Sequence, residues 1–389
     1  METSLIDKRL SIISTVLIVL FSSLILYSVS YGSNGSIQPI PDSEYLDLLD
    51  MVATATKANY ENITTWQGEL RIEEDNYYYD EKCDWLPIAR NDPGASSNSI
   101  RRRVTALVEF AVDIPTDKLY TKLTPTVKYK AVDLDCDVVV DEKYSPIISI
   151  VTPQQYLSYQ PEHTYAYRRD ANAIIDGKLQ GKAAFLMSPE KLKGEQWGHV
   201  RDPRRYFFRG NKTVWDYLYA LRNTIIYQAY IPSGKAPSIE VTEEEANGET
   251  KYHITAGIHG GCIGCPDNEN AFINIITTFD VSAGLNLISH KVTDKTGKTL
   301  QTLDITYEKI SDVYIPKSVH LVTFSFPEQK KLFDSLITFT KSILNEPIPD
   351  GTFTYTNLGL ENGVRLEDEI KNVEYIYYDG KLVPATGGQ

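Results

Sequence analysis

The chain has 389 residues, a formal net charge of −13, and 26 tyrosines against 12 phenylalanines. An acidic surface of this kind repels nucleic acid and anionic lipid, so no nucleic-acid partner is expected, and binding an anionic headgroup would require a local basic patch. The abundance of tyrosine favours half-buried strands, where the ring packs and the hydroxyl group stays in water.

Residues 1–31 are predicted to be an export segment. Lys8-Arg9 precedes an uncharged, apolar run from Leu10 to about Tyr31, and basic residues before such a run direct the rest of the chain out of the cytoplasm. The run approaches the ~20 residues that span a membrane, yet Ser28-Val-Ser30 offers the small residues of a cleavage site. A transmembrane signal anchor and a cleaved signal peptide both remain open. We therefore expect a protein of the cell envelope, on the periplasmic side, membrane-anchored or secreted.

After the export segment, residues 32–42 are predicted to form a flexible tether, and residues 43–59 an amphipathic helix with apolar side chains at helical spacing. An extended segment from Trp66 to Ile72 follows. Prolines, glycines and serines then break the pattern between residues 73 and 99. This stretch predicts an irregular insertion in a single large domain that spans residues 43–389.

Most of the remaining chain alternates apolar and polar residues, as strands do. Val104, Ala106, Val108, Phe110 and Val112 share one face of the first alternating segment. Further strands are predicted at 119–123, 127–140, 147–152, 164–167, 238–245, 250–256, 272–279, 285–293, 299–307, 319–326, 375–378 and 381–383, and a second helix at 213–229. The pattern predicts a mainly β (α+β) protein. Its curved, unclosed antiparallel barrel or sheet would carry helices on one face, in addition to the N-terminal membrane-directed helix.

The four cysteines are Cys83, Cys136, Cys262 and Cys265. In an oxidising compartment four cysteines usually form two disulfides. His259-Gly-Gly-Cys262-Ile-Gly-Cys265 can be interpreted as a disulfide, as a metal site that includes His259, or as a redox pair. The disulfide is favoured because there is no second C-x-x-C to complete a zinc site. Strand alternation buries Cys136, which favours a second bond from Cys83 to Cys136.

No other motif assigns chemistry. Asp133-Leu-Asp135-Cys-Asp137 resembles the start of a calcium loop but lacks the later glycine and glutamate, so a strand with its aspartates in water is favoured. Arg101-Arg-Arg103 is expected at a strand edge, where charge discourages pairing with other chains. The basic and aromatic stretch at 201–212 predicts a structural loop, with an anionic headgroup site as the alternative. Because the sequence lacks the common nucleophile, metalloprotease and phosphate-loop motifs, we predict a non-enzyme without metal or cofactor.

The order of these segments resembles that of a known family. The export segment, the helix and the run Asn59-Tyr-Glu-Asn-Ile-Thr-Thr-Trp66-Gln-Gly-Glu-Leu-Arg-Ile72 look like the opening of periplasmic lipoprotein carriers of the LolA type, in the outer-membrane lipoprotein-sorting superfamily. Lys291–Gly297, Leu303–Tyr307 and Asp312–Pro316 follow the same rhythm of meandering strands. The resemblance covers most of residues 43–326 and implies an unclosed antiparallel barrel whose apolar face, covered by helices, receives acyl chains.

Two functions follow as hypotheses. The first is a non-catalytic extracytoplasmic protein that carries or senses a lipid or other hydrophobic ligand. On this hypothesis the second helix would act as a lid, with its ligand-facing side formed by Trp215, Leu218, Tyr219 and Ile226. The alternative is a structural or sensory envelope protein that binds another protein through its sheet, in which case the same side chains only complete a core.

Overall fold

A computed structural model describes residues 43–78, 100–131, 139–144, 146–160, 163–170, 173–180, 183–189, 238–246, 249–259, 272–325 and 329–385, with the single residues 203, 219 and 223. The chain divides into two compact units. Unit 1 comprises residues 1–62 and 204–335, and unit 2 comprises residues 63–203 and 336–389. Each unit thus combines two separate parts of the chain. The single domain expected over residues 43–389 stays a prediction.

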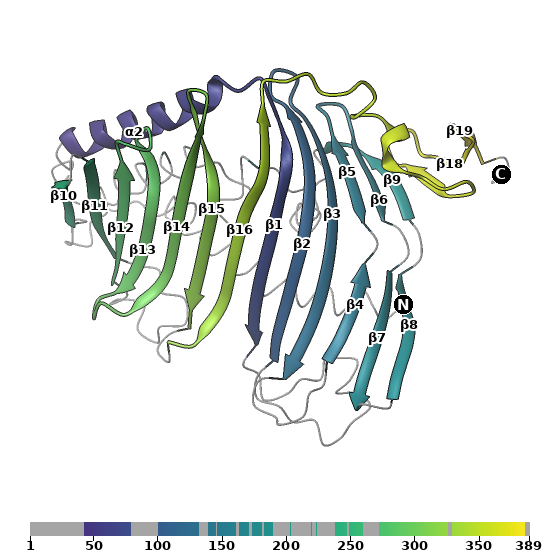
Figure 1. Cartoon of the computed structure of the whole chain (residues 1–389), viewed down its shortest axis with the longest axis horizontal. Helices are drawn as coiled ribbons and strands as arrows, with labels where there is room; N and C mark the ends of the chain where they lie inside the picture. The colour runs from purple at the N-terminus through teal and green to yellow at the C-terminus, as the bar shows by residue number, and fades with distance from the viewer. Residues whose placement is uncertain are drawn as a thin grey trace, which may run out of the picture. The chain divides into compact units, whose positions relative to one another are not determined.

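Unit 1 is an antiparallel meander with one helix (Figure 1). Each strand pairs with the next along the chain, from β10 through to β15. The elements are α2 (Ser43–Glu61), β10 (Ser238–Ala246), β11 (Glu249–His259), β12 (Phe272–Asp280), β13 (Asn286–Asp294), β14 (Thr299–Ile310) and β15 (Val313–Phe324). The predicted hairpin at Asn247-Gly248 is confirmed by the register, in which Ala246 pairs with Glu249.

Helix α2 packs through the stripe that its apolar spacing predicts. Leu49, Val52 and Ala53 are fully buried, two to three turns before the buried Tyr60. The Asn59 side chain fixes the far end of the helix, because it donates to the Tyr314 carbonyl (2.6 Å) and accepts from the Tyr314 N–H (2.8 Å). The helix contacts β13 and β15 and runs past the strand ends of unit 1 (Figure 1). Among the described residues, helices packed on one face of a sheet are therefore not found.

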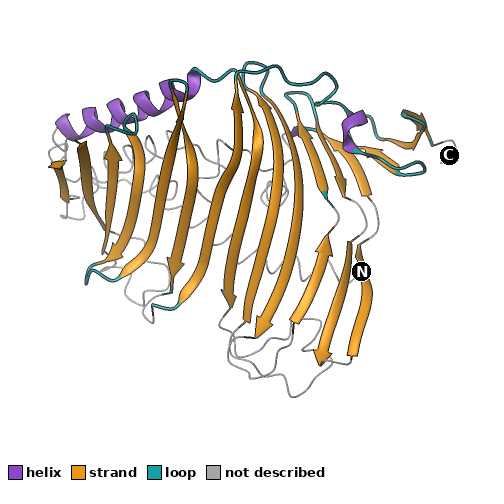
Figure 2. Ribbon diagram, in the orientation of Figure 1, coloured by secondary structure: helices purple, strands orange, loops and turns teal. Residues whose placement is uncertain are grey.

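Unit 2 is built on four long strands in the order β16–β1–β2–β3, which are labelled in Figure 1 and drawn in orange with the other strands in Figure 2. These are β16 (Lys331–Leu344, in this unit from Leu336), β1 (Thr65–Tyr78), β2 (Ile100–Asp113) and β3 (Lys118–Ala131). Strand β3 then pairs with two strands in succession, β5 (Ile147–Val151) near its start and β4 (Val139–Tyr144) further along. The sheet of unit 2 therefore forks at β3.

In both branches of the fork, the strand pairings nearest to β3 are antiparallel. One runs from β4 to β7 (His163–Asp170) and β8 (Ala173–Gln180). The other runs from β5 to β6 (Tyr156–Gln160) and β9 (Ala183–Met187), then through a parallel pairing to β17 (Arg365–Asp368), β18 (Val373–Tyr378) and β19 (Lys381–Pro384). The prediction of a mainly β protein with an unclosed, curved, largely antiparallel sheet is confirmed.

Alternation separates the sheet of unit 2 into two faces around β1, β2 and β3. We call one the Trp66 face, whose large side chains are buried: Trp66, Leu70, Ile72, Val108, Phe110, Val112, Leu119 and Leu123. The other, the Tyr120 face, is charged on β1 and β2 but apolar on β5, β6 and β9. There the C-terminal segment covers it through the 3₁₀ turn η4 (Tyr355–Leu358), with Leu358 and Leu366 fully buried.

Strands β1 and β2 extend further than the sequence predicts, and the charged part of β2 lies inside the sheet instead of at its edge. Strand β1 continues through Tyr78, so residues 73–78 are strand instead of the start of an irregular insertion. The run Arg101–Arg103 pairs with β1 on one side and β3 on the other, and its predicted place at a sheet edge is wrong. Acidic residues on β1 help to explain the difference at Arg103, which is opposite Asp75 and whose Nη2 lies 3.0 Å from Glu73 Oε2.

Several predictions concern residues outside the described part of the chain. These are the export segment and tether, all four cysteines, the three aspartates at 133–137, the basic stretch around 204–212, and residues 79–99 of the insertion. Among the described residues, no helix is both long and apolar enough to cross a membrane.

Candidate functional site

The predicted lid cannot be assembled from the described residues. Trp215, Leu218 and Ile226 lie outside them. Tyr219 is helical, as predicted, and 37% of its surface is exposed. Its ring therefore reaches solvent, and the lid stays a prediction.

The most extensive apolar surface that the structure places together is the Trp66 face of unit 2. At its centre Trp66 stacks on Phe339 of β16, with ring centroids 5.5 Å apart, and meets the edge of Phe110 at 5.6 Å. The indole N–H donates to the Ser342 hydroxyl at 3.3 Å. Offset stacking and edge-to-face contacts are the favoured arrangements of aromatic rings, so three strands are joined by one aromatic cluster.

Beside this cluster, a row of small polar side chains crosses the Trp66 face. The strand register aligns Phe110 of β2 with Thr121 of β3, Thr121 with Ser149 of β5, and Ser149 with Ser158 of β6. We call Thr121, Ser149 and Ser158 the hydroxyl row. It begins beside the aromatic cluster and ends at Phe185 of β9, which is opposite Ser158.

Large side chains flank the hydroxyl row on both sides. One neighbouring line of the register contains Leu119, Val151 and Tyr156, and the other contains Leu123 and Ile147. Side chains two residues apart on a strand point to the same face. The hydroxyl row is therefore a line of small polar side chains between two lines of larger side chains, at right angles to the strands.

The hydroxyl row is buried and incompletely hydrogen-bonded. Thr121 and Ser158 have no exposed surface and Ser149 only 1%. Ser149 Oγ lies 3.3 Å from the Tyr156 hydroxyl. Ser158 Oγ makes no hydrogen bond of good geometry, although it lies close enough to Tyr156 to favour the ionised phenol, while Thr121 Oγ1 has no partner among the described residues. A buried hydroxyl without a partner is costly, on the order of 1–3 kcal/mol.

Around the hydroxyl row the Trp66 face carries no formal charge. Of the described side chains on this face from Trp66 to Ile72, Val104 to Val112 and Leu119 to Leu123, none is an acid or a base. Burial raises the pKa of Tyr156, against the smaller opposing effect of the nearby hydroxyl groups of Ser149 and Ser158. Its phenol is thus neutral, and the row can exchange hydrogen bonds but cannot neutralise an ion.

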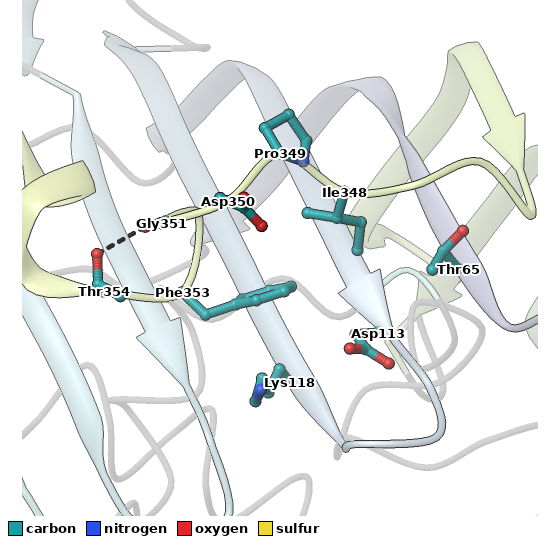
Figure 3. Close-up of a pocket in the computed structure, with 9 residues that line it drawn as sticks. All are labelled: Thr65, Asp113, Lys118, Ile348, Pro349, Asp350, Gly351, Phe353 and Thr354. Atoms are coloured by element: carbon teal, nitrogen blue, oxygen red, sulfur yellow. Dashed lines mark hydrogen bonds between the residues drawn. The ribbon is translucent and has the colours of Figure 1, made fainter.

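A separate crevice of about 340 Å³ lies at the end of β1–β3, under the segment that leads from β16 to η4 (Figure 3). Its charged lining residues are Asp113, Lys118 and Asp350. Lys118 Nζ lies 5.9 Å from the centre of the Phe353 ring. A lysine of the protein itself thus occupies the cation position over this ring, and the crevice offers two carboxylates to one ammonium group.

Among the described residues no cluster of histidine, cysteine, aspartate or glutamate side chains has the arrangement of a metal site. The cysteine motif at residues 262–265 lies outside those residues, so its three interpretations stay open.

The sequence pattern predicts the apolar side of β2 but does not predict the hydroxyl row. Val104–Val112 alternate clearly, and these residues form part of the Trp66 face. Strand β6 was not predicted, because Tyr156-Leu-Ser-Tyr-Gln160 is buried on both faces and lacks alternation. The signal present in the sequence is one small hydroxyl residue between larger side chains in each of three strands. Only the register shows that these residues are neighbours.

No protein-family model matches the sequence, and no curated protein matches it. Solved structures do match. A LolA superfamily protein from Nitrosomonas europaea aligns over 80% of this chain and 99% of its own, with 9% identity and a TM-score of 0.28. A domain named for outer membrane lipoprotein sorting, from Vibrio parahaemolyticus, aligns over 82% and 99%, with 8% identity and a TM-score of 0.27.

A third solved structure, a β-barrel-like protein of a domain of unknown function from Brucella abortus, aligns over 73% of this chain and 100% of its own, with 8% identity and a TM-score of 0.21. Nothing about ligand or activity is transferred from matches at this identity and TM-score.

Proposed function

We propose that this protein is a non-catalytic, extracytoplasmic binder of a lipid or other hydrophobic ligand, and that the Trp66 face of unit 2 receives the ligand. The observation that carries the proposal is the separation of side chains on β1–β3. One face is apolar over most of three 14-residue strands and contains the aromatic cluster, while the other is charged on β1 and β2.

The dimensions and energetics suit an alkyl chain. A strand of 14 residues extends for roughly 45 Å at 3.3 Å per residue, longer than an ordinary strand of five or six residues. Burial of each methylene group contributes ~0.8 kcal/mol, so a dozen carbons give appreciable affinity without any catalytic group. Aromatic rings such as Trp66 and Phe110 supply large contact surfaces at little cost in side-chain entropy.

The place of action follows from the N-terminal segment. Lys8-Arg9 before the apolar run directs the chain outward, which puts both units in the cell envelope, beyond the cytoplasm. A protein that binds a hydrophobic ligand there would meet it at a membrane surface. N-terminal sequencing of the mature protein distinguishes an anchored chain from a cleaved one.

A pair of substitutions on neighbouring residues of β2 tests the function. Val108 is fully buried on the Trp66 face, whereas Leu107 is 42% exposed on the Tyr120 face. Val108→Thr places a hydroxyl group in the binding surface at nearly constant volume. We expect it to weaken binding of the uncharged dye N-phenylnaphthylamine roughly fivefold, since burying an unpaired hydroxyl costs about 1–3 kcal/mol. The matched Leu107→Thr should leave dye affinity unchanged.

Native mass spectrometry of the purified protein, followed by lipid extraction, is the companion measurement. A hydrophobic molecule that co-purifies with the wild type and is depleted in the Val108→Thr protein supports the proposal. If the wild type binds no dye and releases no extractable ligand, the proposal is wrong. The apolar face would then be a core, and the protein a scaffold of the envelope.

A further inference from the structure

We propose that the hydroxyl row, Thr121, Ser149 and Ser158, is a polar subsite that binds the uncharged oxygen group of a hydrophobic ligand, an ester carbonyl or an alcohol. The inference rests on the function proposed above and goes beyond it, because it names the chemical class of the ligand. It excludes a hydrocarbon without a polar group and a ligand whose ionised head would lie on the row.

Hydrogen bonding is the first reason. A face that served only as a core would gain stability from alanine or valine at these positions, because hydroxyl groups in an apolar interior are unfavourable unless they are paired. Thr121 Oγ1 nevertheless has no partner in the described part of the chain, and Ser158 Oγ has none of good geometry. Both are fully buried. An ester carbonyl or an alcohol placed over the row would satisfy these groups.

Shape is the second and independent reason. Each side chain of the hydroxyl row is smaller than its neighbours two residues away on the same strand, such as Leu119 and Leu123 beside Thr121 and Tyr156 beside Ser158. Neighbouring strands lie about 4.8 Å apart, so the row is roughly 10 Å long across β3, β5 and β6. It continues at β2 into Phe110 and the aromatic cluster. A ligand with its oxygen group on the row could extend its alkyl chain over these rings.

The absence of charge determines which oxygen group fits. The hydroxyl row has no acid or base beside it among the described residues of this face. The nearest described cation on β3, Lys122, points to the opposite face and pairs with Glu109 at 2.6 Å. A carboxylate or phosphate on the row would have to lose its water without a counter-ion, which is far more costly than the transfer of a neutral ester.

A ligand series of constant chain length tests the proposal. Methyl oleate, oleyl alcohol and oleate share one cis-unsaturated 18-carbon chain and differ at the end that would meet the row, and 1-octadecene is an 18-carbon hydrocarbon without a polar group. Affinities are measured by displacement of N-phenylnaphthylamine from the full exported protein. We expect methyl oleate and oleyl alcohol to bind five- to tenfold more tightly than 1-octadecene, the range of one or two net hydrogen bonds, and oleate to show no advantage over 1-octadecene.

Thr121→Val removes the hydroxyl group and keeps the shape of the side chain. We expect this variant to bind 1-octadecene as the wild type does and to lose most of the advantage of the ester and the alcohol. Thr124→Val is the matched control, because Thr124 lies on the same strand and pairs with Leu107 on the opposite face. Ser149→Ala and Ser158→Ala provide a second, independent loss of hydroxyl groups should one variant fold poorly.

The outcomes separate the two proposals. If the wild type binds none of the four compounds, the proposed function itself fails. If it binds all four with equal affinity, or if Thr121→Val and Thr124→Val leave the same preference for the ester and the alcohol, then hydrophobic binding stands and the hydroxyl row is not a subsite. Tighter binding of oleate than of methyl oleate would also overturn the inference.

Discussion

At the scale of single residues, His290 shows how burial alone changes chemistry. It lies on β13 of unit 1 with 2% of its surface exposed, and its neighbours across the sheet, Thr277 and Leu303, carry no charge. Thr277 Oγ1 is 3.4 Å from its Nδ1. Loss of water lowers the pKa of His290 from 6.5 to about 4. The side chain is therefore a neutral part of the core at neutral pH.

This pKa shift predicts how the stability of unit 1 depends on pH. Because the folded pKa lies below the unfolded value, the unfolded state takes up the proton first as the pH falls. The neutral His290 therefore contributes to the free energy of unfolding in a pH-dependent way. This contribution is fully present above pH 6.5, is lost as the pH falls from 6.5 to 4, and amounts to about 3 kcal/mol. Urea unfolding, followed by amide exchange in β12–β14, should show this loss in the wild type.

The control is His290→Gln, a side chain that does not titrate. This variant should have a lower stability overall and a flatter dependence between pH 6.5 and 4, with the two curves differing least at pH 4. Parallel curves across that range would contradict the assignment of the loss to His290.

At the scale of elements, the pairing of β1 with β16 depends on Gly68. A side chain at this position would overlap the Lys341 carbonyl and press on the Phe110 ring. Glycine here allows the two strands to approach closely at the centre of the aromatic cluster. The strand-weakening effect of glycine is offset by stacking of Trp66 on Phe339 at the same level.

Gly68→Ala is therefore expected to destabilise unit 2. The free energy of unfolding should fall by about 1–3 kcal/mol, the usual cost of overfilling a packed site, and the Trp66–Phe339 stack should loosen. Urea unfolding and near-ultraviolet circular dichroism measure these two effects. Glu69→Ala, one residue further along β1 on the charged face, should change stability by no more than about 0.5 kcal/mol. Equal effects of the two substitutions would show that the close approach is not required.

The helices and strands also show which parts of the fold can be predicted from the sequence. Helix α2 and strands β10–β14 were predicted nearly to their ends, because each has a clear period and each hairpin joins neighbours. Strand β16 was missed, although Phe333, Ser335, Ile337 and Phe339 are alternately buried. Its pairing with β1 could not be predicted, because hydrophobic alternation does not identify a partner from the distant end of the chain. The hydroxyl row depends on the same long-range register, so it too becomes visible only in three dimensions.

At the scale of the whole molecule, the C-terminal residues are part of unit 2 and not an appendage. Leu358, Leu360 and Leu366 are buried against Ile150 and Leu157 on the Tyr120 face. Asn345 Oδ1 accepts from Thr64 N–H at 2.7 Å, which ties the start of this segment to the start of β1. The segment thus covers an apolar surface of β5, β6 and β9 that would otherwise meet water.

Removal of residues 346–389 should therefore uncover that surface. We expect the shortened protein to bind the dye anilinonaphthalene sulfonate strongly and to aggregate at concentrations at which the intact protein stays monodisperse. The single substitution Leu358→Ala should have a smaller effect, with a loss of about 2–5 kcal/mol in the free energy of unfolding. A shortened protein with unchanged melting temperature and no dye binding would show that the cover is dispensable.

The division of unit 2 between two stretches of the chain constrains the order in which the protein can fold. Trp66 of β1 and Ser342 of β16, which are hydrogen-bonded, are 276 residues apart. If the chain is exported as proposed above, β1 leaves the translocon early, and its partner β16 crosses only after nearly all of the rest of the chain. The hairpins of β10–β15 can form as soon as each pair of neighbouring strands has crossed, because contacts between residues close in sequence form faster than contacts between distant ones. An early β1–β2–β3 sheet with one uncovered edge and an apolar face is prone to aggregate. Export of this protein should accordingly depend on periplasmic holding chaperones for as long as the last fifty residues remain inside the cell.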